Sequence, residues 1–231
     1  MNAKALRAAF PHTVPVLAGY LALGMAFGLM MSDIGLNALW SGLMSLTIFA
    51  GSAQILAVSL LAAGAALTQT ALLILVLNFR HFFYGLSLIA QFRETGWRKP
   101  YLIFGLTDET YALLTATQVP PEVPAPDFYF AVTLLDQSYW VLGSLLGGLV
   151  GALIPFSTDG VDFAMTALFV VLLVEQMKRR ENRLPALVGL GCSLLSLSLL
   201  GPENFLIPAL LGLTLVLLAL RPQLEGREAA A

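Results

Sequence analysis

The chain has 231 residues, of which 58% are hydrophobic and only 11% are charged, whereas an ordinary soluble domain has about 25% charged residues. A soluble fold of this size cannot hide so much apolar surface, so the composition predicts an all-α integral membrane protein. The net charge of −2 is near neutral, and the basic residues form short clusters beside apolar runs, which argues against nucleic acid as a partner. The single cysteine, Cys192, excludes a disulfide framework and a thiolate metal cluster.

The apolar runs and the polar breaks between them predict about six to eight membrane segments. In chain order the segments are 13–31, 36–63, 67–91, 101–117, 128–154, 161–177, 184–200 and 205–220. The linker 118–127 contains Pro120, Pro121, Pro124 and Pro126, so it cannot be helical throughout. We expect one transmembrane transport domain over 1–231, with possible repeat halves at 10–117 and 128–220.

Spacing patterns support a duplication. Gly24-x-x-x-Gly28 in the first segment has counterparts in Gly143-x-x-x-Gly147 and Gly147-x-x-x-Gly151 in the fifth. The same spacing is also common as plain helix packing in membranes.

The basic residues predict the topology, because cytoplasmic loops carry an excess of Lys and Arg. They form four clusters: Lys4/Arg7, Arg93/Arg98/Lys99, Lys178/Arg179/Arg180/Arg183 and Arg221/Arg227. All four clusters can be cytoplasmic only if one segment in each half does not cross. We expect segments 36–63 and 161–177 to be re-entrant or broken, with an inverted second half and both termini in the cytoplasm. Eight ordinary crossings with a weak charge bias are the alternative.

Ionisable side chains inside membrane segments cost roughly 2.5 to 3.5 kcal/mol each on insertion scales, so their presence indicates function. The candidates for proton coupling are Asp108, Glu109, His81, Asp136 and Glu175. Asp108 or Glu109 is the first choice for the proton carrier, and these neighbours point about 100° apart on a helix. His81 also suits a simple hydrogen bond beside Tyr84 at the membrane interface.

The candidates for substrate binding are an arginine and nearby neutral polar groups. Arg80 stays protonated, so it either receives a substrate carboxylate or forms a structural ion pair with an acid. Gly51, Ser52 and Gln54 suit the ammonium and carboxylate of a zwitterion, and they suit a close helix contact equally well. Asn78 completes the set.

Motifs for ATP binding, zinc hydrolysis and a nucleophile elbow do not occur in the sequence, so we expect neither an enzyme nor a cofactor. The three tryptophans, Trp40, Trp97 and Trp140, are predicted to anchor segment ends at the membrane interface.

Three motifs together resemble the AzlC family of branched-chain amino acid permeases: Phe49-Ala-Gly-Ser-Ala-Gln54, Asn78-Phe-Arg-His81 followed by Tyr84, and Thr107-Asp-Glu-Thr-Tyr111. The resemblance extends from about Phe10 through the eighth segment. It implies export of hydrophobic amino acids across a bacterial plasma (inner) membrane, driven by protons. It also implies a much smaller AzlD-type membrane subunit as partner. The motif positions that carry over as site residues are Gly51, Gln54, Asn78, Arg80, His81, Asp108 and Glu109.

Two other functions stay open on the sequence alone. One is a passive channel for a small solute, in which the broken segments line a pore and the carboxylates are structural. The other is a scaffold subunit that is inert without its small partner. Membrane lipid surrounds the chain in each case.

Overall fold

The computed structural model describes residues 3–153, 170, 173–174, 177 and 180–228. They fall into two compact units, Met1–Val161 and Asp162–Ala231. Regular structure within the described ranges is helical and includes no strand, which confirms the predicted all-α class. Three helices there, Ala3–Asp33, Leu67–Ser87 and Arg183–Pro202, are long and apolar enough to cross a membrane.

Residues 3–153 of the first unit form seven α-helices and a short 3-10 helix. In chain order these are α1 (Ala3–Asp33), α2 (Ala38–Thr47), α3 (Gly51–Ala62), α4 (Leu67–Ser87), η1 (Gly96–Arg98), α5 (Lys99–Phe104), α6 (Asp108–Ala116) and α7 (Ala125–Leu153).

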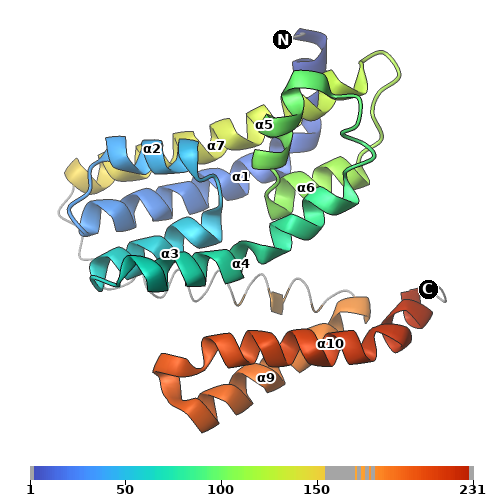
Figure 1. The fold of residues 1–231 in the computed structure, drawn as a ribbon. Coiled ribbons are helices and arrows are strands. Elements are labelled where there is room, and N and C mark those ends of the chain that lie inside the picture. The colour runs from blue at the N-terminus through green and yellow to red at the C-terminus, as the bar shows by residue number, and fades with distance from the viewer. Residues whose placement is uncertain (1–2, 154–169, 171–172, 175–176, 178–179, 229–231) are drawn as a thin grey trace. The chain divides into compact units, whose positions relative to one another are not determined.

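Helices α1 and α7 pack along each other and form the spine of the first unit (Figure 1). Glycines make this contact close: a Cβ added at Gly24 would lie 2.9 Å from the carbonyl oxygen of Trp140, and one at Gly28 would collide with the carbonyl oxygen of Ser144. Small residues at a helix interface let two backbones approach in this way. Gly24 contacts α7 near Trp140 and Gly28 contacts it near Ser144 and Gly148, so residue numbers increase in the same direction along both helices and α1 and α7 run parallel.

The parallel packing differs from the expected relation between the two halves. An inverted second half would direct segment 128–154 opposite to segment 13–31, and α1 and α7 do not show that relation. The possible halves at 10–117 and 128–220 stay a prediction, because residues 154–169 lie outside the described residues.

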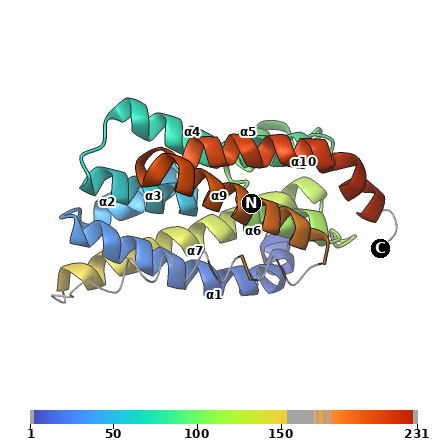
Figure 2. The same cartoon turned by 90° about the horizontal axis from the view of Figure 1, so that it is seen from below.

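The predicted break in segment 36–63 separates α2 from α3. Helix α2 packs against α7, where Ser45 donates a hydrogen bond of 2.7 Å to Ser144. The chain then turns at Phe49, whose φ of 45° lies in the left-handed region. Helix α3 returns toward the end of the unit from which α2 started (Figures 1 and 2). The pair is therefore re-entrant in form, as predicted.

Segment 101–117 is broken as well, although we expected it to cross in full. Helix α5 ends at Phe104, and α6 begins at Asp108 with Thr107 as its N-cap. A threonine cap followed by two acids is a strong signal for a new helix start, which explains the break. Both short helices lie at the end of the unit where α4 finishes (Figure 1).

The two broken pairs enter the first unit from opposite ends, and their turns approach each other. The ring of Phe49 at the first turn lies 6.5 Å from the ring of Phe104 at the second. Tyr20, in the middle of α1, reaches both turns: its ring lies 6.3 Å from Phe49 and its hydroxyl lies 2.7 Å from Thr107 Oγ1. The N-termini of α3 and α6 therefore meet near the middle of the spine.

The second unit contains the hairpin of α9 (Arg180–Asn204) and α10 (Leu206–Glu228). The helices are antiparallel, with Cys192 opposite Gly212 and Ser196 bonded to the carbonyl of Phe205 at 2.7 Å. They match the predicted segments 184–200 and 205–220. Glu175, in the predicted segment 161–177, lies outside the described residues.

Candidate functional site

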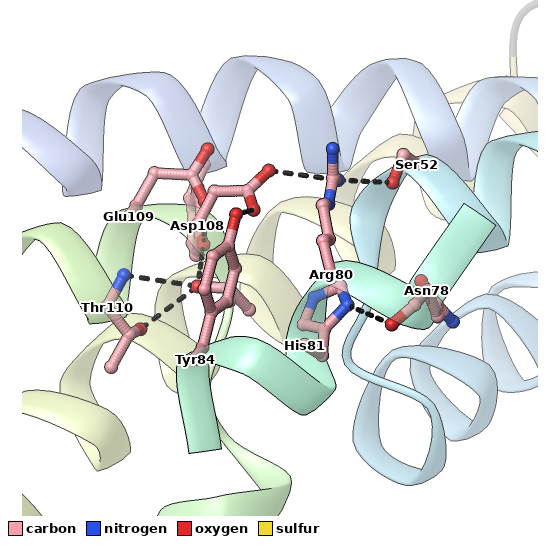
Figure 3. A network of polar contacts seen from close by, with 10 residues as sticks. Ser52, Asn78, Arg80, His81, Tyr84, Asp108, Glu109 and Thr110 are labelled. Atoms are coloured by element: carbon pink, nitrogen blue, oxygen red, sulfur yellow. Dashed lines mark hydrogen bonds and ion pairs between the residues drawn. The ribbon is translucent and has the colours of Figure 1, made fainter. Parts of the chain in front are cut away.

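Arg80, in α4, lies between the N-termini of α3 and α6, the second helices of the two broken pairs (Figure 3). Its Nη2 atom is 2.9 Å from Asp108 Oδ2, at the first residue of α6. The same atom donates a hydrogen bond of 3.0 Å to Ser52 Oγ, in the first turn of α3. The Arg80 and Asp108 side chains are each 42% exposed, so the helices of the first unit do not enclose the pair.

The two helix N-termini beside Arg80 differ in charge. Helix α6 has Thr107 as its cap and Asp108 and Glu109 in its first turn, so its positive helix end is already compensated. Helix α3 has Ala50 at its N-cap and no side-chain cap. An uncapped helix N-terminus and a guanidinium together form a suitable place for a carboxylate.

Asp108 is paired on both oxygens. Tyr84 donates a hydrogen bond of 2.7 Å to Asp108 Oδ1, opposite the contact that Arg80 makes with Oδ2. The ring of Tyr84 stacks on Tyr111 with centroids 4.4 Å apart, and Ser87 donates to the Tyr111 hydroxyl at 3.1 Å. These contacts fix the position of Asp108 relative to Arg80.

Glu109 points away from the ion pair and toward α1, as the 100° offset between neighbouring helix residues predicts. Tyr20 donates a hydrogen bond of 2.7 Å to Glu109 Oε2. A row of hydroxyls continues from Tyr20 through Thr107 and Thr110. It ends where Thr110 donates to Asp136 Oδ2 at 2.7 Å.

Gln54 is fully buried behind the first break. Its Oε1 accepts hydrogen bonds from Trp140 Nε1 at 2.9 Å and from the Ala50 amide at 3.3 Å, and its Nε2 donates to Ser45 at 3.0 Å. Gly51 packs on the same indole, since an added Cβ would lie 2.9 Å from Trp140 Cη2. These contacts support the helix-contact alternative, in which Gln54 and Gly51 position the start of α3.

The prediction that Trp140 anchors the membrane interface is wrong. Its side chain is 3% exposed, and its ring packs between Tyr20 and Phe27 of α1. Trp140 is buried because the close contact of α1 and α7 encloses it. Trp40 and Trp97 are exposed, as expected for interfacial residues.

Asn78 lies on the other side of Arg80 from the two carboxylates, and His81 lies between Asn78 and Tyr84 (Figure 3). His81 Nδ1 is 3.1 Å from the backbone oxygen of Asn78, and its ring centroid is 5.5 Å from that of Tyr84. Asn78 Oδ1 is buried without a hydrogen-bond partner among the described residues. Positions two apart on a helix do not face each other, so Asn78 and Arg80 point to different sides. A substrate contact for Asn78 and a proton-relay role for His81 stay predictions.

Sequence reasoning did not single out Tyr20, Thr107 or Thr110 as site residues. The Thr107-Asp-Glu-Thr110 motif contains the signal for the two threonines, because it reads as a helix start inside an apolar segment. Tyr20 has no local signal in its apolar segment. Among the described residues, no group of three or more His, Cys, Asp or Glu side chains could hold a metal ion.

Comparisons with known proteins identify the family of the chain. The sequence model described as "AzlC protein" matches residues 15–154. The chain is 43% identical to the branched-chain amino acid transport protein AzlC of Bacillus subtilis (strain 168) over 224 residues, which cover 97% of this chain and 88% of that protein. It is 38% identical to a membrane protein of Haemophilus influenzae over 225 residues, or 97% of this chain and 92% of that protein.

A more distant relative is the inner membrane protein YgaZ of Escherichia coli (strain K12), 29% identical over 177 residues that cover 74% of this chain and 72% of that protein. No solved structure matches the chain. Because the matched residues 15–154 contain the whole polar site and the Bacillus subtilis protein aligns with nearly the full length, this chain belongs to the AzlC family.

Proposed function

We propose that this chain exports branched-chain or other hydrophobic amino acids across the bacterial inner membrane, coupled to protons and together with a small AzlD-type subunit. Membership of the AzlC family supports a transporter and not an enzyme, and the Bacillus subtilis relative is named for branched-chain amino acid transport. The observation that carries the proposal is Arg80, held at the uncapped N-terminus of α3 between two broken helices. Broken helices whose N-termini face an anionic solute group are a recurrent transporter arrangement.

The Arg80–Asp108 pair suits a zwitterion. The carboxylate of an amino acid binds the guanidinium of Arg80 and the first-turn amides of α3, and its ammonium group binds Asp108. Arg80 and Asp108 then each exchange one charged partner for another, so neither is left without a counter-charge. An apolar side chain needs no polar partner, and the exposed ring of Phe104 at the second turn is an apolar surface for it.

The two neighbouring acids have different tasks in this proposal. Asp108 forms an ion pair with Arg80, so its task is to bind positive charge. Glu109 accepts a hydrogen bond from the neutral hydroxyl of Tyr20, which suits a group that gains and loses a proton. We therefore assign proton coupling to Glu109.

Efflux of preloaded radiolabelled leucine tests the proposal, in cells that express the chain with and without the small subunit. We expect uncoupler-sensitive efflux from the wild type with the subunit, and loss of that efflux in Glu109→Gln with the protein still in the membrane. Efflux that changes neither with the uncoupler nor with Glu109→Gln would contradict proton coupling and favour a passive channel. Efflux without the small subunit would remove the partner from the proposal.

The topology gives a second prediction. The N-terminal part of α1 and the chain after α4 share one apolar cluster that includes Ala5 and Phe92, so the Lys4/Arg7 and Arg93/Arg98/Lys99 clusters lie at the same end of the first unit. The positive-inside rule places that end in the cytoplasm.

In a Cys192→Ala background, we expect Asp33→Cys to react with a membrane-impermeant thiol reagent in intact cells. Glu94→Cys should react only after the cells are opened, because it lies at the opposite end of the unit. Both native side chains are exposed, so the chain itself does not block labelling. Labelling of Glu94→Cys in intact cells would contradict the predicted orientation and indicate the opposite one.

A further inference from the structure

We propose that the hydroxyls of Tyr20, Thr107 and Thr110 form a relay that carries one proton between Glu109 and Asp136, with Asp136 as a buried proton store. The inference rests on the proposed proton-coupled transport and names the path of the proton within it. The oxygens form a continuous row from Glu109 to Asp136, with successive distances of 2.7, 2.7, 3.0 and 2.7 Å. Three helices, α1, α6 and α7, supply the groups together with the α6 cap, and Figure 3 shows Glu109 and Thr110 at the start of α6.

The number of protons in the row supports the relay. Four links join the five groups, and the three hydroxyls supply one proton each. If both carboxyls were ionised, one link would join two oxygens without a proton between them. A complete row therefore needs one more proton, carried by either Glu109 or Asp136.

Thr107 is compatible with both states. Its oxygen accepts a hydrogen bond from the Thr110 amide at 3.2 Å and also contacts the Tyr20 and Thr110 hydroxyls. A hydroxyl has one proton to donate and two lone pairs to accept with. It therefore donates to Tyr20 and accepts from Thr110, or the reverse, and every contact is satisfied either way.

The environment of Asp136 suits a neutral acid in one of the two states. The residue is 0% exposed, and its Oδ1 atom has no hydrogen-bond partner among the described residues. Negative charge on this oxygen would be uncompensated, whereas the lack of a hydrogen-bond partner costs a neutral, protonated acid far less. Within the described chain, the titratable groups close enough to interact with Asp136 are Glu109, Tyr20 and Tyr101, and none of them brings a positive charge.

The transfer is balanced in protons. Asp136 Oδ2 gives its proton to Thr110, Thr110 gives its own to Thr107, Thr107 to Tyr20, and Tyr20 to Glu109 Oε2. One O–H bond breaks and one forms at each hydroxyl, so the hydroxyls are unchanged afterwards. Asp136 ends as a carboxylate and Glu109 as a neutral acid, and the reverse transfer restores the first state.

The placement of the two ends links the relay to the solute. Glu109 is half-buried and follows Asp108 directly in the chain, so the charge of a bound ammonium group acts on it. A positive charge there favours the ionised form of Glu109 and moves the proton to Asp136. Departure of the solute removes that charge and allows the proton to return.

The test uses proteoliposomes that contain the full chain and the small subunit, with labelled leucine as the probe. Tyr20→Phe removes the central hydroxyl and keeps the ring. We expect it to lose leucine accumulation driven by a pH gradient and to retain leucine counterflow, which needs no net proton movement. The matched control is Tyr139→Phe, because the Tyr139 hydroxyl also lies between α1 and α7, 3.0 Å from Thr13, but outside the row. It should retain both activities.

A second pair of variants separates the relay from a structural role. Thr110→Val should behave as Tyr20→Phe, and Thr110→Ser, which keeps the hydroxyl, should retain accumulation. Infrared spectra of the wild type should show a protonated carboxylic acid band that Asp136→Asn removes. Normal accumulation in Tyr20→Phe and Thr110→Val would overturn the relay but leave the transporter intact. Absence of leucine counterflow in the wild type would instead overturn the proposed function.

Discussion

We expect Arg80→Gln to weaken leucine binding and to reduce leucine export strongly, because it removes the cation that binds the carboxylate. Truncating one partner of a hydrogen-bonded charge pair costs from 2 to more than 5 kcal/mol when the pair is buried. Arg80 and Asp108 are each 42% exposed, so the lower end of that range applies. A loss of about 2 kcal/mol corresponds to roughly 30-fold weaker leucine binding. The measurement is binding of labelled leucine to the purified complex, beside efflux from cells.

Two companion variants decide between a substrate site and a structural ion pair. Arg80→Lys keeps the charge but loses the planar fork of donors, so binding should be intermediate. The double variant Arg80→Gln/Asp108→Asn removes the charge left behind on Asp108. If it restored export, Arg80 would be only a counter-ion for Asp108, and the carboxylate site would be wrong. We expect the double variant to stay impaired, because the solute still has no cation to bind.

The sequence predicted one of the two breaks and not the other, for a physical reason. Gly51, Ser52 and Gln54 interrupt an apolar run of 28 residues (36–63), which is too long for one simple crossing. The segment 101–117 has the length of an ordinary crossing, so hydropathy alone did not predict the break between α5 and α6. The break there depends on Thr107, whose side chain accepts a hydrogen bond from the Thr110 amide and starts a new helix.

The partners of the site residues lay beyond what the sequence could predict. Arg80 was predicted to bind a substrate carboxylate or to pair with an acid, but the sequence did not specify which acid. The contact of Tyr20 with Glu109 joins residues 89 positions apart, and neither hydropathy nor helical periodicity specifies which helices are neighbours. The glycine motifs were interpreted as helix packing or as signs of a repeat. The structure supports packing, because the glycines of α1 and those of α7 face each other in one contact.

Substitution of Gly28 should have a large effect on folding. A Cβ at this position would overlap the carbonyl oxygen of Ser144 and the amide nitrogen of Gly148, both of them backbone atoms of α7. Side chains can change rotamer to relieve such overlap, but a helix backbone cannot move without separating α1 from α7. Overpacking a close contact costs typically about 1–3 kcal/mol, and we expect Gly28→Val to reach the upper part of this range. Thermal unfolding of the purified chain in detergent is the measurement.

The matched control is Gly19→Ala in the same helix, where an added Cβ meets no atom within 4 Å. This change should leave the unfolding temperature unchanged or raise it, since alanine is more favourable than glycine inside a helix by roughly 0.5–1 kcal/mol. Equal stability of Gly28→Val and Gly19→Ala would contradict the parallel contact between α1 and α7. The same contact holds Tyr20 of α1 near Trp140 and places its hydroxyl within reach of Glu109. Gly28→Val should therefore also reduce leucine export, even though residue 28 contacts neither the solute nor the relay.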